Sequence, residues 1–275
     1  MSYRSSMRVV VPVALLAGCA ASVLMAQRAP RGEGQGGCRD GDWGDDSRAR
    51  YCEVRDAGFK PGGAVSVDPG VTGAIRIVGW DRDSVAVTSK VQTQAETDAD
   101  ARALAQQIRV VISDGTIRAE GPATRRRESW IVSFEVSVPR RTDLNAQTVN
   151  GPISVAGVTG KMDLTAVNGP LSLDAVGGDV HARTTNGPLV VTLDGDTWDG
   201  RGLDSQTSNG PVELTIPAHY SAHLETGTVN GPMSFDFPIT VQGRFSGRSI
   251  ETDLGNGGPT VRATTTNGPL TVRRR

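Results

Sequence analysis

The sequence predicts an all-β protein: a β-solenoid, or β-helix-like stack of two-strand coils, with one inserted or capping α-helix and an N-terminal signal segment. Three observations predict this fold. Glycines recur at a spacing of nine residues from Gly151 to Gly187. Short pairs of apolar residues alternate with polar ones between these glycines, and helical periodicity stands out at a single place after the signal. The repeating unit is therefore about 18 residues, with two strands and two turns.

The composition agrees with a folded, turn-rich chain. Of 275 residues, Gly 34 and Pro 15 make 49, below the fraction typical of low-complexity disorder. Aromatic residues are only 4%, so Val, Ile, Leu and Ala must fill the core. With Lys+Arg 29 against Asp+Glu 30, the chain lacks the basic excess of a nucleic-acid-binding protein, and we expect no nucleic-acid partner.

Residues 1–26 have the pattern of a bacterial export signal. Arg4 and Arg8 precede an apolar run from Val9 to Ala26. Cleavage after Ala26 gives a freely secreted protein, whereas the Leu-Ala-Gly-Cys pattern ending at Cys19 gives a lipidated one, and an uncleaved anchor is the third alternative. The pattern predicts an exported protein of the periplasm, the cell surface or the medium, with membrane association only through a lipid anchor or the signal segment.

Residues 27–64 read as a linker and a disulfide-containing segment. In an oxidising compartment we expect Cys38 and Cys52 to form a disulfide rather than a metal site, because neither a second cysteine pair nor a histidine lies nearby. The acidic run at 40–46 lacks the glycine and glutamate that an EF-hand loop requires, which favours a solvated loop.

Residues 65–141 read as a degenerate N-terminal part of the solenoid. Ile75 and Ile77 alternate with polar residues, and Val85 and Val87 resume the pattern after a turn at 80–83. A helix is predicted over 97–108, where Thr97 and Asp100 form a capping-box-like start and small or apolar residues share one face. Further strands are expected at 110–112, 117–119 and 130–138.

Residues 142–275 contain the regular repeats, with Asn-Gly-Pro at the turns. Asn and Gly tolerate the positive φ of a tight turn, and Pro suits the first position of a strand. No helix in this span could cover a flat sheet, so the chain must coil to bury its apolar face, and stacked Asn amides can then bond from coil to coil. The predicted turns are Asn150-Gly151-Pro152, Asn168-Gly169-Pro170, Asn186-Gly187-Pro188, Asn209-Gly210-Pro211, Asn230-Gly231-Pro232 and Asn267-Gly268-Pro269.

These features resemble the bacterial putative adhesin domain family of unknown function. The resemblance covers roughly residues 65–273 and lies in GAIRIVGWDRDSVAV at 73–87, the helix after it, VSFEVSVPR at 132–140 and the TVNGPISV-type units that follow. It implies an exported β-solenoid at the cell surface or in the periplasm. It transfers no ligand and no catalytic residue.

The sequence predicts no catalytic, cofactor or metal site. His181 is expected to face outward. His219 and His223 have the spacing of a zinc-binding helix, but their segment reads as extended, which separates them by about 13 Å. An enzyme hypothesis remains: a β-helical polysaccharide-acting enzyme with Asp163, Asp174, His181 and Arg183 on outward positions of neighbouring strands.

The favoured hypothesis is a non-catalytic envelope or surface protein that presents a polar sheet to a glycan, a wall polymer or another protein. Its outward positions include Ser154, Thr165, Ser172 and Thr192, which suit polar recognition. A purely structural envelope protein is the other alternative.

Two arginine clusters, at 125–127 and 273–275, are expected to protect turns and the last open strand edge, the alternative being contact with anionic lipid or wall polymer. Trp198, in the long loop at 194–204, is expected to pack back on the solenoid rather than face a ligand.

Overall fold

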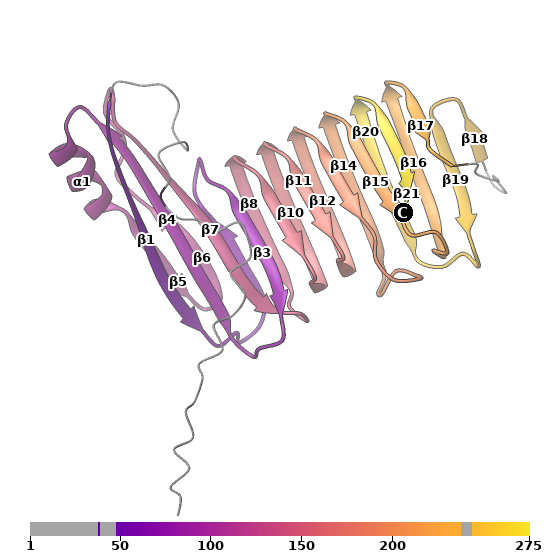
Figure 1. Ribbon diagram of the computed structural model, residues 1–275, viewed down its shortest axis with the longest axis horizontal. Helices are drawn as coiled ribbons and strands as arrows, with labels where there is room; N and C mark the ends of the chain where they lie inside the picture. The colour runs from indigo at the N-terminus through magenta and orange to yellow at the C-terminus, as the bar shows by residue number, and fades with distance from the viewer. Residues whose placement is uncertain (1–37, 39–47, 238–243) are drawn as a thin grey trace, which may run out of the picture. The chain divides into compact units, whose positions relative to one another are not determined.

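The computed structural model describes residues 38, 48–237 and 244–275. The signal segment 1–26 with Cys19, the linker 27–37 and the acidic loop at 40–46 lie outside the described residues. The described part consists of two large sheets and one helix, which confirms the all-β prediction (Figure 1). A disulfide joins Cys38 to Cys52, as predicted.

We call the two sheets sheet A and sheet B. Sheet A has ten strands in the spatial order β1 (Ala49–Phe59), β4 (Val85–Ala95), β7 (Ser129–Pro139), β3 (Ile75–Trp80), β9 (Ile153–Ala156), β11 (Leu171–Asp174), β13 (Leu189–Thr192), β15 (Val212–Ile216), β21 (Leu270–Arg274) and β17 (Met233–Phe235). Sheet B has eleven, in the order β18 (Arg244–Ser246), β19 (Ser249–Leu254), β16 (Ala222–Asn230), β20 (Thr260–Asn267), β14 (Gly202–Asn209), β12 (Gly177–Asn186), β10 (Thr159–Asn168), β8 (Leu144–Asn150), β2 (Val65–Asp68), β6 (Thr116–Glu120) and β5 (Arg109–Ser113).

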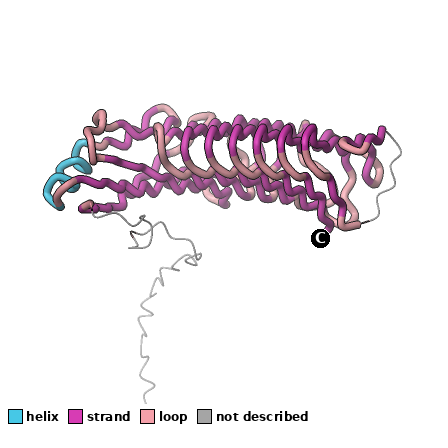
Figure 2. The backbone as a smooth tube through the Cα atoms, turned by 90° about the horizontal axis from the view of Figure 1, so that it is seen from above, coloured by secondary structure: helices cyan, strands magenta, loops and turns pink. Residues whose placement is uncertain are grey.

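From β8 to β17, consecutive strands alternate between the two sheets (Figure 2). Within each sheet these strands pair in parallel, and Leu171 of β11 lies opposite Ile153 on one side and Leu189 on the other. These partners are 18 residues apart in the sequence, so the repeat sets the register of the ladder.

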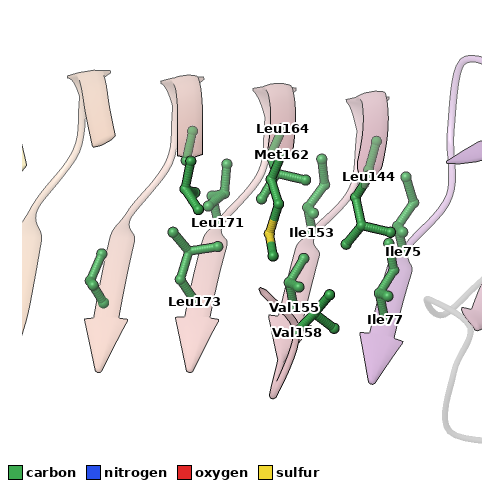
Figure 3. Packing of buried hydrophobic residues seen from close by; sticks show 14 of the residues in the cluster. Ile75, Ile77, Leu144, Ile153, Val155, Val158, Met162, Leu164, Leu171 and Leu173 are labelled. Carbon is green, nitrogen blue, oxygen red and sulfur yellow. The ribbon is translucent and has the colours of Figure 1, made fainter. Parts of the chain in front are cut away.

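The core lies between the sheets and is built from the inward residues of every strand. Because side chains alternate across a strand, each short strand supplies two or three apolar groups to this interior. Burying each Leu, Ile or Val contributes roughly 1.5–3 kcal/mol. Figure 3 shows part of this packing, which includes Ile75, Ile77, Leu144, Ile153, Val155, Val158, Met162, Leu164, Leu171 and Leu173.

The Asn-Gly-Pro glycines are needed for close backbone approach rather than for the positive φ that the sequence suggested. None of the six asparagines has positive φ, and among the six glycines only Gly151 and Gly268 do, at 153° and 159°. At all six, however, an added Cβ would lie 2.0–2.2 Å from the carbonyl oxygen of the glycine on the neighbouring strand turn. A side chain at any of these positions would force neighbouring turns apart.

The six asparagines form one column in which each side-chain amide bonds to the next. Nδ2 of Asn186 donates to Oδ1 of Asn168 at 2.8 Å, and Asn168 donates to Asn150 at 3.0 Å. The column ends where Asn150 donates to the carbonyl of Val71 at 3.1 Å. Its order is Asn150, Asn168, Asn186, Asn209, Asn267 and Asn230.

The N-terminal part differs from the expected degenerate solenoid. Ile75 and Ile77 lie on β3, which pairs in parallel with β9, but Val85 and Val87 lie on β4, which is antiparallel to both β1 and β7. With 11 residues each, these three strands are much longer than the four-residue strands that the repeats contribute to the same sheet, such as β9. Alternating apolar residues look the same in parallel and antiparallel strands, which explains the difference.

Helix α1 (Asp98–Gln107) matches the predicted helix, with Thr97 as its N-cap accepting a hydrogen bond from the Asp100 backbone N–H at 3.1 Å. It packs against β4 and β1 at the end of sheet A, where its buried Ala101 accepts a hydrogen bond from Oγ1 of Thr93 at 2.7 Å. The helix therefore covers the long antiparallel strands and does not cover the repeats.

The last two strands lie inside the array and not at its edge. β20 pairs with β14 on one side and β16 on the other, and β21 lies between β15 and β17. In Figure 1 the yellow β20 accordingly lies between the orange strands β14 and β16. The insertion places residues 260–274 between two segments that precede them in the chain.

This insertion corrects the expectation for the arginines at 273–275, because the strand that carries them is not an open edge. Arg273 forms an ion pair with Glu213 at 2.9 Å, and Arg275 bonds the carbonyl of Leu193 and the carboxylate of Asp194 at 2.9 and 2.8 Å. Arg273 thus binds the neighbouring strand β15, and Arg275 binds the segment that directly follows β13. In the other cluster, Arg127 lies 3.6 Å from Glu96.

Candidate functional site

The outward face of sheet B carries rows of polar side chains, because parallel pairing in register aligns equivalent positions. One row runs through Asp163, His181, Asp204, Arg262 and Glu225 on five adjacent strands. Most of these groups bind one another: His181 lies 3.5 Å from Asp179 and 3.8 Å from Asp204, and Nε of Arg262 donates to Glu225 at 2.7 Å. The hydrogen bond to Glu225 raises the pKa of Arg262, which stays charged.

The residues of the enzyme hypothesis do not share one face. Asp163, His181 and Arg183 lie on β10 and β12 of sheet B, but Asp174 lies on β11 of sheet A. The alternation of strands between sheets separates it from the others. Of the predicted hydroxyl positions, Ser154, Ser172 and Thr192 are on sheet A, and Thr165 is on sheet B.

His219 and His223 also differ from their prediction. His219 lies in a turn between β15 and β16, where the Tyr220 backbone N–H donates to the Pro217 carbonyl at 3.2 Å, so the segment is not extended throughout. His223 is on β16 and lies 2.7 Å from Asp253. Across residues 38, 48–237 and 244–275, no three His, Cys, Asp or Glu side chains are grouped so as to hold a metal ion.

Trp198 packs onto the repeats, as predicted, and does not face solvent. It is 4% exposed, and its indole N–H donates to the Gly178 carbonyl at 2.9 Å. The long loop that carries it also bonds to Gly178 through Asp199 and Arg201, which holds the loop against the preceding strand turn.

Two hollows lie side by side on the outward face of sheet B. The first, which we call the charged hollow, has about 340 Å³ of open volume over Gly202 and Thr260, where large side chains are missing. Its rim combines three acids, Asp179, Asp204 and Glu225, with His181, Arg201 and Arg262. Because these opposite charges are paired with each other, the charged hollow is nearly neutral.

The second hollow, which we call the threonine groove, has about 400 Å³ of open volume, within the range of ordinary ligand sites. It crosses β12, β14, β20 and β16 and reaches the turn before β19. Its outward polar and exposed groups are those of Arg183, Thr185, Gln206, Ser208, Thr264, Thr266, Val229, Arg248 and Ser249.

Beneath these outward groups lies a layer of buried threonines whose hydroxyls donate hydrogen bonds to backbone carbonyls. Oγ1 of Thr184, Thr207, Thr265 and Thr228 each donates to a glycine carbonyl of a neighbouring turn at 2.9 Å. Since the floor strands are paired on both sides, their outward hydroxyls are held at the strand spacing of about 4.8 Å.

Gly227 allows the far end of the threonine groove to close. An added Cβ at Gly227 would lie 2.8 Å from the Arg248 carbonyl oxygen, so the turn before β19 could not approach so closely with a larger residue. The approach is fixed by a hydrogen bond from the Thr228 backbone N–H to that carbonyl at 2.9 Å. Arg248 therefore forms the end wall of the groove, and its guanidinium donates to the Val229 carbonyl at 2.9 Å.

Sequence reasoning missed this groove. Its residues come from β12, β14, β20, β16 and β19, whose spatial order departs from their chain order. Three of the six Asn-Gly-Pro triplets directly follow a hydroxyl residue, and these residues, Thr185, Ser208 and Thr266, are the signal that could have pointed to it.

No family model matches the chain, and no curated protein matches it. Solved structures resemble it at low identity. A putative cell adhesion protein from Clostridium sporogenes is 9% identical, with 82% of this chain and 100% of that chain covered and a TM-score of 0.43. A putative adhesin from Bacteroides fragilis is 13% identical, covering 81% and 97%, with a TM-score of 0.30. A putative lipid binding protein from Parabacteroides distasonis is 9% identical, covering 82% and 96%, with a TM-score of 0.32. These similarities are too low to carry an argument about function.

The helix in the described part of the chain, α1, is neither long nor apolar enough to cross a membrane.

Proposed function

We propose that this protein is a non-catalytic, exported envelope or surface protein, a β-solenoid that binds a polysaccharide on the outward face of sheet B. The observation that carries the proposal is the threonine groove, a polar depression across several strands lined by hydroxyl, amide and guanidinium groups. Such groups match the hydroxyls of a sugar chain, which both donate and accept hydrogen bonds.

The rigidity of the floor supports binding by this face. Each floor strand is hydrogen-bonded to a strand on both sides, and the buried threonines donate to backbone carbonyls. The floor is therefore already ordered, and ligand binding costs little conformational entropy. The end wall of the groove weighs against a purely structural role. A stack of repeats does not need a wall that depends on Gly227 and Arg248.

The chemistry of the face argues against catalysis. The acids and bases of the charged hollow are engaged with each other, and the candidate Asp174 lies on the other sheet. A polysaccharide-cleaving enzyme needs two groups that flank a scissile bond, and the acids of the charged hollow are paired with basic groups instead.

The experiment fills the groove without changing its charge. Thr266→Trp places a large ring at an exposed groove position, and Ser172→Trp places the same ring on the outward face of sheet A as a matched control. Binding of the full exported chain to neutral and acidic oligosaccharides of defined length is measured by titration calorimetry.

We expect the parent protein and Ser172→Trp to bind at least one class of oligosaccharide, and Thr266→Trp to lose that binding. Circular dichroism and thermal unfolding show that each variant is folded. Failure of the parent to bind any oligosaccharide, or equal binding by both variants, would overturn the proposal.

A further inference from the structure

We infer that the ligand of the threonine groove is an acidic oligosaccharide segment, a run of sugars with carboxylate groups, lying across the strands from Arg183 to Arg248. This inference rests on the proposed function and specifies its ligand. It follows from the charge of the groove, from its direction and from the pairing of the strands beneath it.

The charge of the groove has one sign. Among the described residues that line it, Arg183 and Arg248 are the only charged ones. The guanidinium of Arg248 donates to a backbone carbonyl rather than to a carboxylate, and the guanidinium of Arg183 donates to the Asp204 carboxylate at 3.0 Å. The charged hollow beside it is nearly neutral, because its three acids are paired with its cations, so an anionic ligand would favour the threonine groove over its neighbour.

The two arginines lie at opposite ends of the groove. Arg183 is on β12, and Arg248 comes directly before β19, four strand pairings away along sheet B. At about 4.8 Å for each pairing, the two strands are roughly 19 Å apart. A single sugar cannot reach both ends, whereas a short oligosaccharide can, with carboxylates at the ends and hydroxyls over Gln206, Thr264 and Ser208.

Two other classes of anionic polymer fit less well. An acidic peptide would gain most by adding to an open strand edge, but every floor strand from β12 to β16 is already paired on both sides. A nucleic acid would seek aromatic rings for stacking and a run of basic groups, and the described lining has no aromatic ring and two arginines.

The experiment compares each acidic probe with its own neutral form. The probes are oligomers of galacturonate, alginate and hyaluronan, each matched with the carboxyl-reduced oligomer of the same length, and titrated against the full exported chain. We expect at least one acidic probe to bind more tightly than its reduced form, by tenfold or more, and its affinity to fall as salt is raised.

Charge variants locate the effect. Arg183→Gln and Arg248→Gln should each weaken binding of the acidic probe roughly tenfold. Arg76 is an exposed arginine on sheet A, away from the groove, and Arg76→Gln should leave the affinity for the acidic probe unchanged. Asp204→Asn should strengthen binding several-fold, because it releases Arg183 from its carboxylate partner. A purely structural role for Asp204 predicts weaker binding instead.

The outcomes separate the inference from the function on which it rests. Equal binding of the acidic and reduced forms, or loss with Thr266→Trp but not with the arginine variants, overturns the acidic ligand and leaves the polysaccharide function standing. Binding of no probe overturns both. Tighter binding by Arg248→Gln than by the parent would also overturn the inference.

Discussion

Replacing Gly169 by Ala tests whether close approach of the turns holds the repeats together. The new Cβ would lie 2.0 Å from the Gly151 carbonyl oxygen, and real Cβ atoms essentially never come within 3.0 Å of another atom, so the two turns must separate by the difference of 1.0 Å. The φ of Gly169 is outside the positive range, so the contact alone sets the cost.

The magnitude follows from the bonds that cross this contact. The backbone bonds from Gly151 N to Asn168 O and from Ile153 N to Pro170 O are both 3.0 Å, and the amide bond from Asn168 to Asn150 is also 3.0 Å. Lengthened to about 4 Å, all three exceed hydrogen-bond range. At about 0.5–1.5 kcal/mol for each of the three bonds, the free energy of unfolding should fall by roughly 1.5–4.5 kcal/mol.

Urea unfolding monitored by circular dichroism measures this change. Gly62→Ala is the control, because an added Cβ there meets no atom within 4 Å, while the effect of alanine on the unfolded chain is the same. If Gly169→Ala unfolds at the same urea concentration as Gly62→Ala, the turns are not held by close approach and the reasoning is wrong.

Two further predictions concern the column of asparagines and a buried tyrosine. Asn186→Ala removes two amide bonds, of 2.8 and 2.9 Å, and should lower the free energy of unfolding by roughly 1–3 kcal/mol, whereas Asn145→Ala, outside the column, should change it little in the same urea assay. Burial, with a smaller effect from Asp194, raises the pKa of Tyr220 to about 12. Since the unfolded side chain titrates near 10, the unfolded state releases its proton first, and stability should fall as pH rises from about 10 to 12. Tyr220→Phe should reduce this loss, and an unchanged alkaline unfolding profile would contradict the assignment.

The regular strands could be predicted because the length of the repeat equals the sequence separation between paired residues of neighbouring strands. Leu171 and Leu189 are one repeat apart in the sequence and directly opposite in sheet A, so glycine spacing and apolar alternation suffice to place them. The helix after Thr97 was equally accessible, since its cap and its apolar face are local signals.

The spatial order of the last strands could not be predicted. The triplets at Asn209, Asn230 and Asn267 carry the same turn residues, so each could stack on any other, and nothing local shows that Asn267 lies between the other two. The threonine groove depends on that order, because Thr264 and Thr266 lie between Ser208 and Val229 only after the insertion. The antiparallel pairing of β4 was hidden for a similar reason, since Val85 and Val87 would alternate in either direction.

The inserted strand pair also has a consequence for biosynthesis. Residues 222–235 are translated before residues 260–274 and yet stack beyond them, so β16 and β17 must wait with an open side or first pair with β14 and β15 and later be displaced. Either state exposes unpaired strand edges, and the same segment of a second nascent chain can pair with them. Folding of this protein is therefore vulnerable to strand exchange between molecules until residues 260–274 of each chain have inserted between their own neighbouring strands.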